Sequence, residues 1–154
     1  MIRILLLSVI VLLSAFSASA DGDKKKSKQE MFKEILEFKM KYLAQEMDLK
    51  GDQRQKFFDL YSEMTQRKNQ CWKNARHMEK KLRKNDNPSE ADYQAVTDAM
   101  NKAKAEDATI ENEYSDKFSS FLTQKQIFKM KEAEDSFRKK MEEMRRKNHH
   151  KEKK

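Results

Sequence analysis

Residues that form tight turns are scarce in this chain, and this scarcity restricts its folds more than any other feature. Glycine and proline, the two main turn residues, occur only as Gly22, Gly51 and Pro88 among the 154 residues. Short β-hairpins depend on glycine or similar residues at their turns, so a sheet of hairpins is nearly excluded. Charged residues make up 39% of the chain, and the mean hydropathy is −1.07. Long helices that pack along narrow apolar stripes suit so polar a chain. The sequence therefore predicts an all-α fold.

The first twenty residues differ in composition from the rest. Arg3 precedes the apolar run ILLLSVIVLLSAF, and SASA then supplies the small residues that signal peptidase requires. The apolar run is shorter than the roughly 20 residues that cross a bilayer, which favours a cleaved signal peptide over a membrane anchor. We expect residues 1–20 to be removed on export. The mature protein should begin near Asp21, with no membrane attachment.

Charge and apolar spacing organise the remainder. The charged segments 21–28 and 147–154 are expected to be a mobile arm and a basic mobile tail. Residues 29–146 are expected to form one all-helical domain. Its four helices are predicted at about residues 28–47, 52–85, 87–120 and 123 onward.

The second and third helices carry matched apolar seams. Apolar residues recur in each at alternating steps of three and four, which is typical of helices that pack side by side. The seams consist of Phe57, Tyr61, Met64, Cys71, Ala75, Met78 and Leu82 in one helix, and of Tyr93, Val96, Met100, Ala103, Ile110, Tyr114 and Phe121 in the other. They predict a thin, extended antiparallel hairpin, with Asn87 as the N-cap and Pro88 as the first residue of the third helix.

Cys71 is the only cysteine, so no disulfide within the chain is available. Its place on the seam favours a buried apolar role. Pairing with a second chain is the alternative.

The segment FLTQKQI marks the start of the fourth helix. Thr123 is expected to be its N-cap and to form a capping box with Gln126, while Leu122 and Ile127 occupy the positions of a hydrophobic staple. The chain should therefore turn a defined corner here and then resume as helix.

A second corner repeats this spacing. LKGDQ also joins two expected helices, and its Leu49 and Gln53 are separated as Leu122 and Gln126 are.

Two L-x-x-x-Q corners in an exported, all-helical chain resemble the Spy/CpxP family, whose mark is a pair of LTxxQ motifs. Leu122, Thr123 and Gln126 match that motif fully, whereas Lys50 replaces the threonine of the first copy. The resemblance implies a periplasmic, ATP-independent chaperone that forms a thin, cradle-like homodimer and holds client proteins on its concave side.

The first helix has two apolar faces. One holds Leu36, Met40, Leu43 and Met47, and the other, roughly 140° away at about 100° per residue, holds Met31, Ile35, Phe38 and Tyr42. One neighbour covers one stripe, so the second must meet a dimer partner, a second neighbour within the chain, or clients. For client binding, the expected contacts are Met31, Ile35, Phe38, Lys39, Tyr42, Phe58, Lys68 and Trp72.

Signatures of enzymes are missing from the sequence, and no cofactor is expected. There is no phosphate-binding glycine loop, and His77 has no histidine or cysteine one helical turn away. His149 and His150 could bind a transition metal weakly, but we assign no metal site. The net charge of +8 is spread over all helices, which argues against nucleic-acid binding.

Two functional hypotheses follow. The first is the ATP-independent chaperone, which captures unfolding proteins on a mixed apolar and basic helical surface and suppresses their aggregation. The second is a periplasmic stress or metal-responsive regulator that binds one dedicated partner. A Skp-like holdase would need a strand-rich body, for which no alternating Val/Ile/Thr segment is present.

Overall fold

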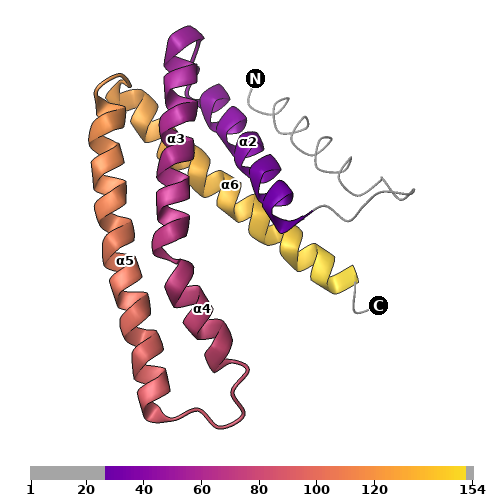
Figure 1. Ribbon diagram of the computed structural model, residues 1–154. Coiled ribbons are helices and arrows are strands. Elements are labelled where there is room, and N and C mark those ends of the chain that lie inside the picture. Colours follow the sequence, from indigo (N-terminus) through magenta and orange to yellow (C-terminus); the bar gives the residue numbers. More distant parts are fainter. Residues whose placement is uncertain (1–26, 152–154) are drawn as a thin grey trace. The chain divides into compact units, whose positions relative to one another are not determined.

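The computed structural model describes residues 27–151, and this range is helical apart from short connections (Figure 1). The all-α fold with a long helical hairpin is confirmed for this part of the chain. The predicted signal peptide, most of the charged arm and the last residues of the tail lie outside it. The helices are α2 (Lys28–Glu46), α3 (Gly51–Cys71), α4 (Lys73–Leu82), α5 (Glu90–Ser119) and α6 (Gln124–Lys151).

The chain divides into two compact units between Glu34 and Ile35. The described part of the first unit, residues 27–34, begins α2 with a capping box. There the Ser27 hydroxyl accepts from the Glu30 N–H at 3.2 Å, and the Glu30 carboxylate accepts from the Ser27 N–H at 2.8 Å. The second unit contains the rest of α2 and all of α3 to α6. No described helix is apolar over a length that would cross a membrane.

An aromatic cluster forms the core of the second unit. The Phe57 ring centroid lies 5.2 Å from that of Tyr61 and 5.7 Å from that of Phe118, in the tilted arrangements that aromatic pairs prefer. Phe57, Tyr61 and Tyr114 confirm the predicted seam at this end of the hairpin, but the buried Phe118 was not in it, and the predicted Phe121 is only half-buried. The largest fully buried side chains are Leu43, Met47, Phe57, Tyr61, Tyr114 and Phe118.

The seam weakens toward the hairpin turn. Ala75, Val96 and Ala103 are buried there, but Tyr93, a predicted seam residue, is 49% exposed. Cys71 is a free thiol that is only half-buried, so the expected burial is incomplete.

The predicted second helix is interrupted at Trp72, where the chain bends from α3 into α4 (Figure 1). Two side chains occupy backbone carbonyls at this point. The Cys71 thiol donates to Lys68 O at 3.1 Å, and the Arg76 guanidinium donates to Asn69 O at 2.7 Å. The Trp72 N–H reaches Lys68 O only at 3.4 Å, a long hydrogen bond. Side chains inserted into the backbone ladder are a recognised cause of helix bends.

The N-cap of α5 is Ser89, so the prediction of Asn87 was wrong. The Ser89 hydroxyl accepts from the Asp92 N–H at 3.2 Å, and the Asp92 carboxylate accepts from the Ser89 N–H at 2.9 Å. Pro88 therefore precedes the cap, and the Asn87 N–H donates to Asn85 Oδ1 within the turn at 3.1 Å. The reciprocal bonds between Ser89 and Asp92 are the physical reason for the later start.

Candidate functional site

The corner before α6 has the predicted capping box. Thr123 Oγ1 accepts from the Gln126 N–H at 3.2 Å, and Gln126 Oε1 accepts from the Thr123 N–H at 2.9 Å. Leu122 and Ile127, the expected hydrophobic staple, are 5% and 9% exposed. Burial of this pair sets the direction in which α6 leaves the corner.

The corner before α3 is built differently. Asp48 has a φ of 55° and is the left-handed residue of a Schellman motif, in which the Leu49 N–H donates to Ala44 O at 2.9 Å and the Asp48 N–H to Gln45 O at 3.0 Å. Lys50 makes no side-chain cap bond, as expected of a residue that replaces a capping threonine.

The two corners are joined by their glutamines. Gln53 Nε2 donates to Gln126 Oε1 at 3.1 Å, Gln126 Nε2 donates to Gln53 Oε1 at 3.1 Å, and Gln53 Nε2 also donates to Phe121 O at 2.9 Å. Leu49 and Leu122 are both 5% exposed and belong to the same buried cluster. The equal Leu–Gln spacing was the signal for this pairing, but spacing alone did not predict that the corners meet.

The second face of α2 is only partly covered. Phe38 and Tyr42 are half-buried, and each ring centroid lies 6.1 Å from that of Phe137 on α6. A second neighbour within the chain, one of the expected alternatives, therefore meets this part of the face. Ile35 is 38% exposed and, in the first unit, Met31 is 39% exposed.

Lys39 lies in a network of charge and aromatic rings. Its ammonium is 3.3 Å from a Glu134 carboxylate oxygen, which also accepts a hydrogen bond from the Tyr61 hydroxyl, and 5.3 Å from the Tyr61 ring centroid. Burial, and secondly the Glu134 carboxylate, raise the pKa of Tyr61 well above its usual range. Because the Lys39 ammonium is already paired with Glu134, it is less available to bind a ligand.

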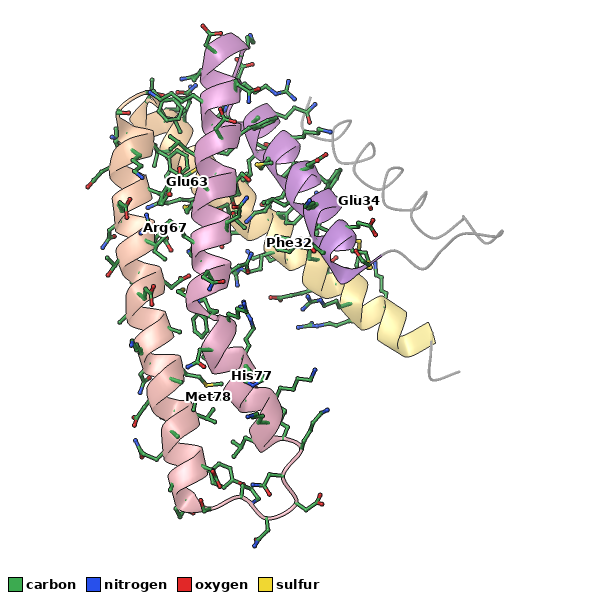
Figure 2. The ribbon with its side chains drawn as sticks, viewed as in Figure 1. Phe32, Glu34, Glu63, Arg67, His77 and Met78 are labelled. Atoms are coloured by element: carbon green, nitrogen blue, oxygen red, sulfur yellow. The ribbon has the colours of Figure 1, made fainter. Side chains whose placement is uncertain are left out.

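Lys68 is similarly engaged between α3 and α5. Its ammonium lies 2.9 Å from Glu111 and 3.2 Å from Asp107. Burial alone would lower the pKa of Lys68, but the hydrogen bonds and charges of the two carboxylates outweigh it, and the pKa is raised. The neighbouring Arg67, which Figure 2 shows between α3 and α5, pairs with both carboxylate oxygens of Glu113 at 2.8 and 2.7 Å.

The remaining predicted contacts are half-buried. Trp72 lies at the bend between α3 and α4. The Phe58 ring packs 6.0 Å from that of Phe57, and the Arg54 guanidinium lies 5.3 Å from its centroid. The Lys56 ammonium likewise lies 4.7 Å from the Phe121 ring centroid.

Two large apolar side chains to which the sequence assigned no role are exposed. Phe32, labelled in Figure 2, is 42% exposed, and Phe128 is 63% exposed. Phe128 directly follows the buried Ile127, so its position off the apolar stripe of α6 was a readable signal.

A groove of about 380 Å³ opens between α3, α5 and α6. Apolar side chains line part of it, and Lys68, Lys131 and Glu134 are among its charged residues. The apolar ones are Met64, Phe118, Ile127 and Met130.

Among the residues whose side chains are described, no group of three or more His, Cys, Asp or Glu could hold a metal ion. The His149 and His150 side chains lie outside that set. Comparisons with protein-family models, curated proteins and solved structures find no match to this chain.

Proposed function

We propose that this protein is an ATP-independent periplasmic chaperone of the Spy/CpxP type, which binds unfolding proteins on an apolar and basic helical surface and thereby suppresses their aggregation. The observation that carries the proposal is the large apolar side chains left exposed in a highly charged chain. They are Met31, Phe32 and Ile35 on α2 and Phe128 on α6, at 38–63% exposure.

Such a surface suits weak, general capture. Burying a large apolar side chain contributes about 1.5–3 kcal/mol when burial is complete, so a few partial contacts hold a client only loosely. Loose binding permits release without a nucleotide cycle. The two L-x-x-x-Q corners resemble the paired LTxxQ motifs of the Spy/CpxP family, and this resemblance supports the same proposal.

The basic part of this surface differs from the one expected. Lys39 and Lys68 are paired with carboxylates, whereas Arg54 and Lys56 are exposed and lie over the rings of Phe58 and Phe121. A cation beside a partly covered ring offers long-range attraction and a short-range apolar contact together. We therefore add Arg54 and Lys56 to the proposed client surface.

Light scattering tests the proposal. Several unrelated clients are diluted from denaturant with the purified mature protein, without ATP and with or without a chelator. We expect suppression of aggregation across clients at about one dimer per client, unaffected by the chelator. No suppression at several-fold excess would sink the proposal. Chelator-sensitive binding to a single partner would favour the regulator instead.

Matched variants locate the surface. Met31→Ser and Ile35→Ser, separately and together, should weaken suppression several-fold. The control Tyr93→Ser removes a somewhat more exposed apolar side chain near the hairpin turn. None of these changes touches the core, so unfolding midpoints should stay close to the wild type. An equal loss in Tyr93→Ser would contradict the placement of Met31 and Ile35 on the client surface.

A further inference from the structure

The two ends of the hairpin are packed very differently. At the end near the corners, α3 and α5 bury the large rings of Phe57, Tyr61, Tyr114 and Phe118, each at most 2% exposed. Beyond Trp72, the buried side chains are the small residues Ala75, Val96 and Ala103. Stability of local segments follows the apolar surface they bury, so this end is held less firmly.

We define the hairpin arm as α4, the connection 83–89 and residues 90–104 of α5. Of its larger apolar side chains, Met78, Leu82 and Met100 are only half-buried and Tyr93 is exposed. Figure 2 shows Met78 on α4. Two grooves lie in this region, one of about 450 Å³ that includes Ala75, Ala99 and Ala103, and one of about 270 Å³ that includes Met78, Leu82 and Val96. The contact between α4 and α5 is close, but small side chains make it and little apolar surface is buried there.

The ion pairs that bridge the hairpin stop at the beginning of the arm. Arg67 binds Glu113, and Lys68 binds Asp107 and Glu111. Among the described residues, no ion pair or side-chain hydrogen bond links α4 to the arm's part of α5. The Arg83–Glu79 pair lies along the chain at i,i+4.

The bend at Trp72 provides the boundary. Side chains donate to Lys68 O and Asn69 O. The regular backbone hydrogen bonds from residue i to residue i−4 are therefore interrupted between α3 and α4. A helix of 10 residues is too short to be stable alone in water. The formation of α4 thus depends on its contact with α5, which buries few large apolar side chains.

We propose that the hairpin arm unfolds locally as a unit, with its boundary in the α3–α4 helix at Trp72, while the aromatic end of the hairpin stays folded. Opening uncovers Met78, Leu82, Val96 and Met100 to solvent. This inference rests on packing and hydrogen bonding alone and does not depend on the proposed function.

Native-state hydrogen exchange of the purified mature protein, read by NMR residue by residue, tests the opening. We expect amides of residues 76–82 and 94–103 to exchange together, about 100-fold faster than those of 57–64 and 110–118 after correction for intrinsic rates. A ratio below tenfold would overturn the proposal, because the hairpin would then open only as a whole.

A pair of substitutions on α5 tests the cause. Ala99→Leu fills part of the larger groove and should slow exchange in the arm several-fold, without changing exchange at the aromatic end. Ala105→Leu makes the same change at an exposed position of the same helix and should leave both regions unchanged. Equal effects of the two variants, or slowing at both ends of the hairpin by Ala99→Leu, would overturn the proposal.

Discussion

Replacing Gln126 by Ala should lower the free energy of unfolding by about 2 kcal/mol. Its side chain accepts from the Thr123 N–H at 2.9 Å and exchanges two hydrogen bonds of 3.1 Å with Gln53. Each such bond contributes about 0.5–1.5 kcal/mol net, and the half-exposed setting places these toward the lower end. Gln53→Ala should cost a similar amount, about 2 kcal/mol, because it also removes the bond to Phe121 O.

The double variant shows whether the two corners are coupled. Since the two glutamines share two of their hydrogen bonds, the double variant should cost about 3 kcal/mol and not the sum of about 4, a coupling of about 1 kcal/mol. Urea unfolding followed by far-UV circular dichroism gives all three values. Gln55→Ala is the control, because Gln55 lies on the same helix and donates only to exposed Asp59. It should cost less than about 0.5 kcal/mol. Single effects that add within about 0.3 kcal/mol would refute a joint between the corners.

Three further changes test individual contacts. Asp48→Gly should stabilise the fold by about 1 kcal/mol in urea unfolding, because Asp48 occupies left-handed backbone with a φ of 55°; a loss of stability would contradict this. Hydrogen bonds from the Ser89 backbone and hydroxyl lower the pKa of Asp92 below 3.8. Because the pKa of Asp92 is lower in the folded state than in the unfolded state, its carboxylate stabilises the fold at pH values above the unfolded-state pKa. This contribution is lost as the pH falls through the folded-state pKa. Thermal melts from neutral to about pH 2 should therefore show a smaller acid loss in Asp92→Asn than in the wild type, and equal losses would refute it. Tyr61→Phe removes one of the two donors to the Glu134 carboxylate, which keeps Lys39, and should lower the free energy of unfolding by about 1–2 kcal/mol, whereas an unchanged value would show that the bond is not formed.

Local patterns in the sequence predicted local structure well. The Thr123 capping box was readable because every participant lies within four residues. The start of α5 was harder, since Asn87 and Ser89 are both good caps and each has an acidic residue three positions later. The choice between them depended on which pair closed both hydrogen bonds, which residue spacing does not reveal.

Features that depend on contacts between distant segments could not be read. No glycine or proline marks the bend at Trp72 in the sequence, and the bend follows from where the Arg76 guanidinium and the Cys71 thiol donate. The charges of Lys39 and Lys68 looked available in the sequence, because their carboxylate partners are 95 residues away in one case and on the opposite helix of the hairpin in the other.

The joint between the corners carries no formal charge. Dissolved salt weakens the attraction between exposed ions such as Arg67 and Glu113, and strong acid protonates the carboxylate and removes its charge. Two neutral amides that face each other are insensitive to both changes. An increase in ionic strength should therefore loosen the sides of the hairpin before it loosens its corners. The two corners should therefore keep their geometry at salt concentrations or pH values at which the ion pairs are already broken.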